Sequence, residues 1–202
     1  GTPNRFLINI QPDQKEGVRR LLKDAMIADV NLYPMVRGRL IEVNGKTISP
    51  DDFADDRAQR LVDREFNLSY GQSLPQGNRI VSGTWHGATE GNQLSLEEGL
   101  AKTLGLHLGD KLTFDVAATQ VTATVTSIRA LDWSSLRVNF FAILTPQALL
   151  SASQTWITAY RQESQEATLD ANLVARYPNL TVVNVDSSFT IDFAPKAKAP
   201  KV

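Results

Sequence analysis

Residues 94–116 read LSLEEGLAKTLGLHLGDKLTFDV, and this stretch indicates the fold more clearly than any other part of the chain. Ser95 and Glu98 have the spacing of a capping box, which predicts a helix start, and Gly105 suits the left-handed position just past a helix end. Leucines recur at four-residue intervals on one helical face: Leu96, Leu100 and Leu104. Apolar residues then alternate as one face of a strand: Leu112, Phe114 and Val116. The stretch predicts a short helix, a turn at 109–110 and a strand, and it suggests no chemistry.

The composition of the chain is that of an ordinary globular protein. Of its 202 residues, 42% are hydrophobic and 21% are charged. The net charge of −1 gives no overall field that would favour nucleic acid. The absence of cysteine excludes disulfides, cysteine zinc sites and a thiol nucleophile. No apolar run is long enough to predict a membrane span, and no signal peptide is predicted.

Both ends of the chain follow the pattern strand, helix, strand. At the N-terminal end, the periodicity predicts a strand over 5–11, a helix over 12–26 and a strand over 32–43 that is closed by a turn at Asn44-Gly45. At the C-terminal end, it predicts strands over 138–144, 156–161 and 180–185, with helices over 146–150 and 165–177.

The middle of the chain is mostly β. A weak helix is predicted over 53–62, and strands are predicted over 64–70, 79–85 and 121–126, the last entered through a hairpin turn at 117–120. The simplest architecture is an α+β fold. Residues 3–48 and 136–187 then form a split α/β sandwich, residues 49–135 form an inserted β-rich subdomain, and the Ala/Pro/Lys tail 188–202 is disordered.

Few residues are candidates for catalysis or ligand binding. His86 and His107 lie in or beside loops without metal-ligand spacing, so a surface or turn role is predicted for each. There is no GxSxG elbow, P-loop or GxGxxG motif. Four aspartates form an acidic cluster that suits charge near a helix N-terminus better than a metal site: Asp51, Asp52, Asp55 and Asp56. The prediction is a chain without catalytic, cofactor-binding or metal-binding residues, and not an enzyme.

Five stretches together carry a family resemblance. They are NRFLINIQPDQ (4–14), REFNLSY (64–70), GNRIVSGTW (77–85), LSLEEGLAKTLGLHLGDKLTF (94–114) and LDWSSLRVNFFAIL (131–144). In combination they resemble the large periplasmic domain of ABC transporter permeases of the FtsX/MacB/LolCE type, most closely the YbbP-like group.

The resemblance implies a fold, a location and partners. The fold would be a MacB-type periplasmic core, in which a porter-like α/β subdomain made from both chain ends carries an inserted β-rich subdomain. The domain would project from the periplasmic face of the bacterial inner membrane, between transmembrane helices that this sequence does not contain. A cytoplasmic ABC ATPase subunit would drive it without a cofactor bound to this chain. Its periplasmic partner would be an esterase or thioesterase, and its cargo hydrophobic or lipid-like.

A partner-facing surface is predicted at 79–91, with Arg79, Trp85 and His86 as its candidate residues. Alternatively, these loops merely connect strands. Two other functions remain open at this stage. One is a free-standing periplasmic adaptor that binds through edge strands. The other is a periplasmic esterase, which would need a serine within hydrogen-bonding distance of His86 or His107.

Overall fold

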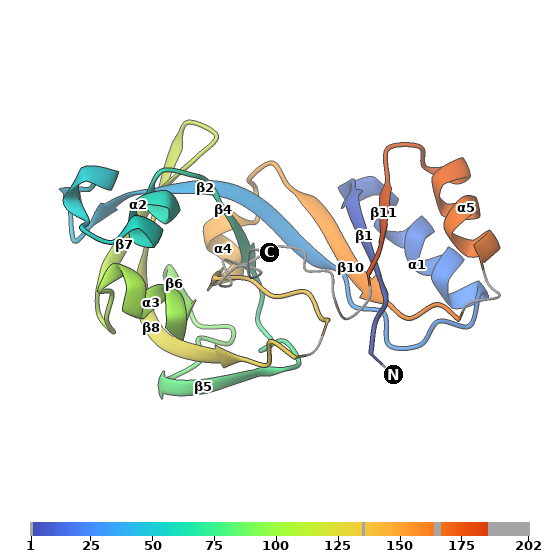
Figure 1. Cartoon of the computed structure of the whole chain (residues 1–202), viewed down its shortest axis with the longest axis horizontal. Helices are drawn as coiled ribbons and strands as arrows, with labels where there is room; N and C mark the ends of the chain where they lie inside the picture. The colour runs from blue at the N-terminus through green and yellow to red at the C-terminus, as the bar shows by residue number, and fades with distance from the viewer. Residues whose placement is uncertain (1, 135, 164–166, 186–202) are drawn as a thin grey trace. The chain divides into compact units, whose positions relative to one another are not determined.

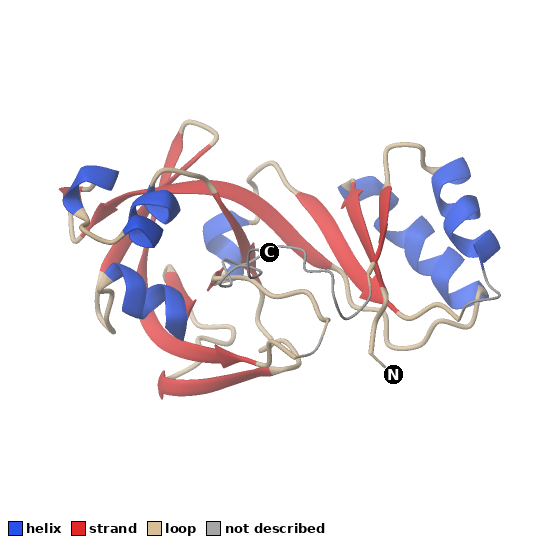
Figure 2. Ribbon diagram, viewed as in Figure 1, coloured by secondary structure: helices blue, strands red, loops and turns tan. Residues whose placement is uncertain are grey.

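The computed structural model describes residues 2–134, 136–163 and 167–185. Helices and strands are mixed along the chain, so the predicted α+β class is confirmed (Figure 2). The chain divides into two compact units. Unit 1 holds the described residues within 1–35, 133–138 and 154–191, and unit 2 holds those within 36–132 and 139–153.

These boundaries differ from the predicted ones at 48/49 and 135/136, and strand pairing is the reason. β2 (Tyr33–Val43) is one continuous strand, and its residues from Val36 onward pair within unit 2. β9 (Ala142–Leu144) pairs with two other strands of unit 2, so residues beyond the predicted insert also belong there. The assignment of the units as a porter-like subdomain and an inserted subdomain stays a prediction.

Unit 1 is an antiparallel sheet with two helices. The strands are β1 (Arg5–Ile10), β10 (Thr155–Tyr160), β11 (Thr181–Asn184) and the start of β2, in the order β11-β1-β10-β2. The helices α1 (Lys15–Asp24) and α5 (Ala167–Arg176) lie on one side of this sheet (Figure 1). A short 3-10 turn, η1 (Pro12–Gln14), leads into α1. The predicted strand–helix–strand pattern at the N-terminal end is therefore confirmed.

An irregularity in β1 lets two core residues face the helices. Asn9 has a φ of 70°, and the register of β1 against β10 shifts between Leu7 and Ile10. Strict alternation would put residues 7 and 10 on opposite faces, whereas a bulge restores them to one face. Both are fully buried in the core of unit 1. Its other buried members are Val18, Leu22, Leu32, Tyr160, Leu169, Leu173 and Leu180.

Unit 2 is built around a closed ring of paired strands. The ring runs β2-β4-β9-β6-β8-β7 and returns to β2, with β5 paired to β8 outside it. The strands are β4 (Phe66–Tyr70), β5 (Asn78–Gly83), β6 (Gln93–Glu97), β7 (Lys111–Val116) and β8 (Thr119–Leu131). Closure leaves the ring strands without free edges, which a small β-structure needs in order to protect its backbone.

Helices and short elements complete unit 2. They are β3 (Lys46–Thr47), η2 (Pro50–Asp52), α2 (Asp56–Val62), α3 (Glu98–Leu104) and α4 (Pro146–Leu149). Phe66 lies at the centre of the core, with its ring edge-on to Phe114 at 6.3 Å and to Phe141 at 6.0 Å. Such aromatic pairs stabilise a core beyond the area that they bury.

The predicted turns are confirmed. Asn44 and Gly45 both have positive φ between β2 and β3. Ala117 and Ala118, also at positive φ, join β7 to β8 as a two-residue hairpin. Gly105 ends α3 in the left-handed conformation. Residues 165, 166 and 186–202, which include the predicted tail, lie outside the described residues.

The predicted helix start at Ser95 is wrong. Ser95 lies in β6, because residues 93–97 are held extended by pairing with β8 and β9. The helix begins at Glu98, and Glu97 is its N-cap. The Glu97 carboxylate accepts hydrogen bonds from the amides of Gly99 at 2.7 Å and Leu100 at 2.8 Å. Tertiary pairing therefore overrides the local capping signal.

The predicted strand over 138–144 is mostly wrong, since only 142–144 form β9. Val138, Phe140 and Phe141 are nevertheless buried, which explains the apolar run. The carbonyls of Phe140 and Phe141 accept hydrogen bonds from the side chain of Arg129. The Phe141 carbonyl also accepts from the backbone amide of Glu97 at 2.8 Å, so side-chain and backbone donors together satisfy this segment.

Gly83 offers a test of the close approach between β5 and β8. Its φ is +78°, and a Cβ there would lie 2.2 Å from the carbonyl oxygen of Thr126. We expect Gly83→Ala to lower the free energy of unfolding by about 3 kcal/mol, measured by urea denaturation. Gly91→Ala is the matched control, because its φ is +88° but nothing lies within 4 Å. It should cost only the backbone strain, roughly 1–2 kcal/mol. Equal losses would contradict the proposed clash.

Candidate functional site

The predicted partner-facing residues do not form one exposed cluster. Arg79 is exposed on the outer strand β5. Trp85 is half-buried, and its indole nitrogen donates to the carbonyl of Gln72 at 2.7 Å. The sequence predicts a surface or turn role for His86. It is only 2% exposed, so the surface alternative is wrong, whereas its carbonyl accepts from the amide of Thr89 at 3.0 Å, as in a turn. Its ring stacks on Trp85 with centroids 4.0 Å apart. The assignment of this loop to a partner stays a prediction.

His86 supports the loop from inside. Its Nε2 lies 2.9 Å from the carbonyl oxygen of Gly71, so Nε2 carries the proton and donates it. Burial is the main reason that the pKa of His86 is lowered, and the Arg129 charge lowers it further, while the bond to Gly71 opposes both. The ring is therefore held neutral in the folded chain.

The structure tests the contact that the esterase alternative requires, a serine hydrogen-bonded to a histidine. Among the residues that the structure describes, His86 Nδ1 has no hydrogen-bond partner. His107 has an exposed side chain, and its Nδ1 lies 3.9 Å from Asp110 Oδ2. Neither histidine is hydrogen-bonded to a serine within the described chain. A nucleophile–base pair of the kind used in acyl transfer is thus not assembled here.

The acidic cluster has local structural roles. Asp55 caps α2, and its side chain accepts from the amide of Ala58. Asp52 accepts from the amide of Ser49 at the start of η2. These contacts agree with the predicted role of the aspartates at helix N-termini. Across the described residues, no group of three or more potential ligands is placed to hold a metal ion.

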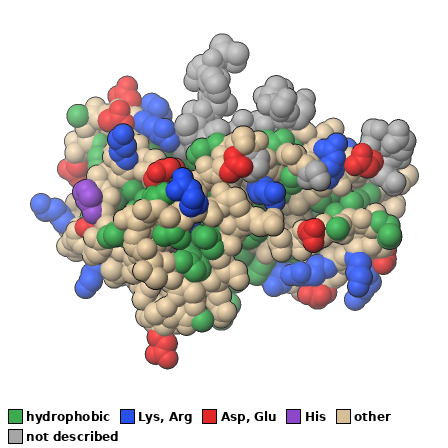
Figure 3. Space-filling model, turned by 90° about the horizontal axis from the view of Figure 1, so that it is seen from below, with side chains coloured by type: hydrophobic (Ala, Val, Ile, Leu, Met, Phe, Trp, Pro, Cys, Tyr) green, Lys and Arg blue, Asp and Glu red, His purple; other side chains and the backbone are tan. Residues whose placement is uncertain are grey.

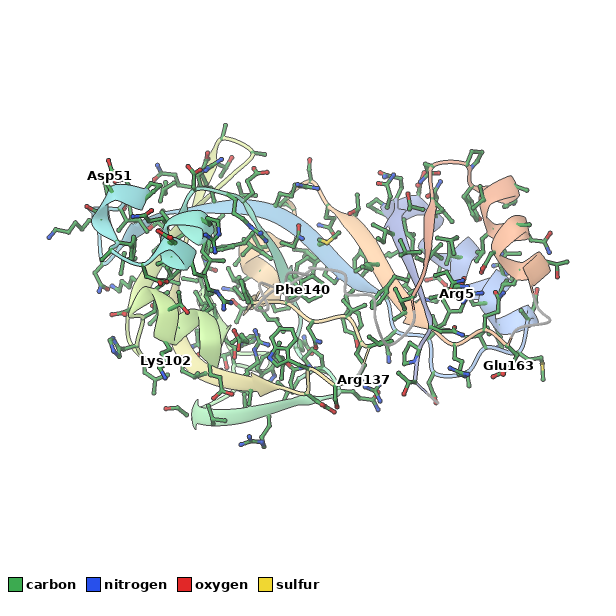
Figure 4. All side chains as sticks on the ribbon, in the orientation of Figure 1. Arg5, Asp51, Lys102, Arg137, Phe140 and Glu163 are labelled. Carbon is green, nitrogen blue, oxygen red and sulfur yellow. The ribbon has the colours of Figure 1, made fainter. Side chains whose placement is uncertain are left out.

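The most deeply buried charge in unit 2 is Arg129, on β8, which has no solvent exposure. Its Nε donates to the Ser95 hydroxyl at 3.0 Å, and Nη1 donates to Asn78 Oδ1 at 2.8 Å. Its Nη2 lies within hydrogen-bonding distance of three carbonyl oxygens, those of Ser95, Phe140 and Phe141. One guanidinium therefore joins β5, β6 and the segment leading into β9. Phe140, whose carbonyl is one of the acceptors, is labelled in Figure 4.

Glu97 balances this charge without a direct ion pair among the contacts described. The two residues are register partners between β6 and β8, so their side chains share one face of the sheet. Burial lowers the pKa of Arg129 to about 9, and the Glu97 carboxylate opposes this shift. Arg129 is thus still cationic at neutral pH. A buried charge with all of its donors directed at protein acceptors positions chain segments, which is a structural role.

Sequence reasoning missed Arg129, although a signal was present. Along β8 the inward positions are Ala123, Val125, Ser127 and Arg129. When the next inward-facing position of an alternating strand holds a charged residue, its side chain needs hydrogen-bond partners in the interior. The acceptors could not be found in this way, because Phe140 and Phe141 contribute only backbone carbonyls.

A second polar cluster lies in unit 1, where the start of β1 pairs with the end of β11. Arg5 at the start of β1 is the register partner of Asn184 at the end of β11. We name the residues around this pair the end clasp, in which Gln162 contributes only its backbone: Asn4, Arg5, Tyr160, Gln162, Asp170 and Asn184. Arg5 lies among the strands of unit 1 in Figure 4, where it is labelled. The sequence gives no local signal for this cluster, because its members are up to 179 residues apart.

Arg5 is the centre of the end clasp. Its Nε lies 2.8 Å from Asp170 Oδ2, and its Nη1 donates to Asn184 Oδ1 at 2.8 Å. The other oxygen of Asp170 accepts from the Tyr160 hydroxyl at 2.8 Å. Burial, together with this bond to a carboxylate, raises the pKa of Tyr160. The hydroxyl therefore stays protonated and remains a donor.

Comparison with known proteins supports a permease relationship. The chain is 36% identical over 184 residues, 91% of its length, to the uncharacterized ABC transporter permease YbbP of Escherichia coli strain K12. The predicted resemblance to YbbP-like ABC transporter permeases is confirmed. The chain spans 22% of the length of YbbP, so it corresponds to one part of that permease.

Two further comparisons add less. A crystallised domain assigned to a permease protein of Porphyromonas gingivalis aligns with a TM-score of 0.45 at 14% identity, over 92% of this chain and 95% of that domain. No family model matches the chain. Within the described part of the chain, no helix is both long and apolar enough to cross a membrane. Charges of both signs are interspersed on the face shown in Figure 3.

Replacement of Arg129 tests its structural role. We expect Arg129→Met to lower the free energy of unfolding by about 3–5 kcal/mol, because it removes the side-chain donors to Ser95, Asn78 and Phe140 and leaves Glu97 without a nearby cation. Arg79→Met, on the exposed outer strand, should change it by less than about 0.5 kcal/mol. Urea denaturation measures both variants. Similar values for the two would show that Arg129 does not organise unit 2.

The pH dependence of stability tests the buried state of His86. The unfolded chain protonates this residue near pH 6.5, whereas the folded chain, with its lowered pKa, resists protonation. The free energy of unfolding should therefore fall as the pH drops below about 6.5, by up to about 1.4 kcal/mol per pH unit from this group. His86→Gln should flatten the slope between pH 6.5 and 5 relative to the unchanged chain. An unchanged slope in His86→Gln would refute burial of a neutral ring.

Proposed function

We propose that this chain is the non-catalytic extracytoplasmic domain of an ABC transporter permease. In this role it transmits the ATP-driven motion of a cytoplasmic ATPase subunit across the bacterial inner membrane. The motion would act on a periplasmic partner, an esterase or thioesterase in our prediction, or on a hydrophobic or lipid-like substrate. The similarity to YbbP supports the permease relationship.

The observation that carries this proposal is the pairing of β1 with β11. The pairs run antiparallel from Arg5 with Asn184 to Ile8 with Thr181. The backbone of Asn4 also accepts a hydrogen bond from the amide of Val185. The start of the first described strand and the end of the last described strand therefore lie side by side in unit 1. If each of these two strand ends is attached to a membrane segment, the domain moves when the two segments move.

The construction of unit 2 suits a body that is moved as a whole. Its ring of strands is closed, and its aromatic core and Arg129 network link segments from across the sequence. Close-packed cores of this kind transmit displacement instead of absorbing it. We further propose that unit 1 corresponds to the porter-like subdomain and unit 2 to the inserted one of a MacB-type core. The partner surface would lie on unit 2 near Arg79 and Trp85, with His86 as internal support.

Cysteine labelling tests the location. The chain has no cysteine, so a single one can be introduced into a full-length permease that carries this chain and is otherwise cysteine-free. Lys102 is exposed on α3, and Leu100 on the same helix is 1% exposed. In spheroplasts with an intact inner membrane, Lys102→Cys should react with a membrane-impermeant maleimide.

The controls for labelling use the same helix and the same membrane. Leu100→Cys should react only after denaturation, which shows that the domain is folded during labelling. Reaction of Lys102→Cys only after permeabilisation would place the domain on the cytoplasmic side and overturn the proposal.

Coupling to ATP hydrolysis is the second test. In vesicles containing the permease and its ATPase, a fluorophore on Lys102→Cys should report an ATP-dependent change. A flexible linker of about ten Gly and Ser residues inserted between Pro3 and Asn4 should abolish this change while hydrolysis continues. A signal that survives the linker would contradict transmission through the start of β1.

A further inference from the structure

We propose that the end clasp is a mechanical latch that keeps the start of β1 and the end of β11 together when the segments attached to them are drawn apart. Arg5 is its principal positioning residue. This inference rests on the proposed function for its physiological meaning, but the latch itself is a property of unit 1.

The strand geometry creates the need for a latch. Because β1 and β11 are antiparallel neighbours, a force that separates their adjacent ends acts first on the terminal pair, Arg5 and Asn184. The ladder hydrogen bonds would then break one after another instead of sharing the force. The backbone at this position is tied by the bonds from Val185 to Asn4 and from Asn4 to Tyr160.

The side chain of Arg5 crosses this weak point. It bonds Asn184 on β11 and forms an ion pair with Asp170 on α5, both at 2.8 Å. The exposed fractions of the Arg5 and Asp170 side chains are 12% and 24%, so water and salt screen this pair less than an open surface pair. Tyr160 holds the second oxygen of Asp170. Movement of β1 away from β11 must therefore also break its ion pair with α5, whose carboxylate is held in place by Tyr160 of β10.

Asn4 adds a further connection on the other side of β1. Its Nδ2 donates to the carbonyl of Gln162 at 2.8 Å, and its Oδ1 accepts from the amide of Gln162 at 2.8 Å. The amide side chain thus continues the pairing past the end of β10. β1 is held on both sides at the position where force would enter.

The latch can be tested by pulling the purified chain from its two ends in optical tweezers. We expect Arg5→Met to unfold about tenfold faster than the unchanged chain at the same constant force, because an ion pair and a charge-assisted hydrogen bond are lost. Arg5→Lys should fall between the two, since it keeps the charge but cannot bond Asp170 and Asn184 as a fork.

Two matched variants separate the latch from general stability. Arg161→Met removes an exposed arginine at the same end of unit 1, which bonds Thr2 and Glu163, and should leave the rate unchanged. Val18→Ala creates a cavity in the core of unit 1. It should lower chemical stability at least as much as Arg5→Met, but should accelerate forced unfolding less. Equal rates for Arg5→Met and Arg161→Met, or a larger acceleration by Val18→Ala, would overturn the latch.

The outcome is independent of the permease proposal. Pulling measures the isolated chain, whereas labelling of Lys102→Cys tests membrane location. If the domain is cytoplasmic but the latch is confirmed, the proposed function is overturned and the latch stands as a property of unit 1. A periplasmic location with equal rates for the two arginine variants would leave the proposed function intact and remove the latch.

Discussion

The antiparallel pairing of β1 with β11 is the constraint from which the organisation of unit 1 follows. It joins residues that are 179 positions apart, and it places the start of β1 beside the end of β11. α1 and α5, which adjoin these strands in the sequence, then pack against each other and against the sheet. Any force applied to both ends converges on one pair of residues. The polar side chains around Arg5 lie at this point, and the proposed latch rests on them.

Unit 2 solves a different physical problem. Its ring of strands closes on itself, which removes free edges but requires the chain to return between β4 and β6 through β9. Residues 136–141, which precede β9, form no strand. The side chain of Arg129 donates hydrogen bonds to two of their carbonyls, those of Phe140 and Phe141. A fully desolvated guanidinium is costly, and it is retained where its directed donors position several segments at once. The charge is thus used for architecture.

These features fit the proposed function, in which the domain transmits motion within a permease. The described residues assemble neither a metal cluster nor a histidine–serine pair, and the strongest polar networks tie segments together. In the function that we propose, such a body acts by being moved and by presenting a surface. The similarity to part of YbbP supplies the setting in which such motion has a source.

The sequence by itself determined the α+β class, most strands and helices, the turns at Asn44-Gly45 and after α3, and the resemblance to YbbP-like permeases. These depend on local periodicity, on the conformational preference of glycine and on the order of motifs, which can all be recognised from the sequence without the fold. The true cap at Glu97, the burial of His86, the Arg129 network and the end clasp were decided only by the tertiary structure. Each depends on groups brought together by strand pairing over long separations, and several of those groups are backbone carbonyls, which have no signature in the identity of their residues.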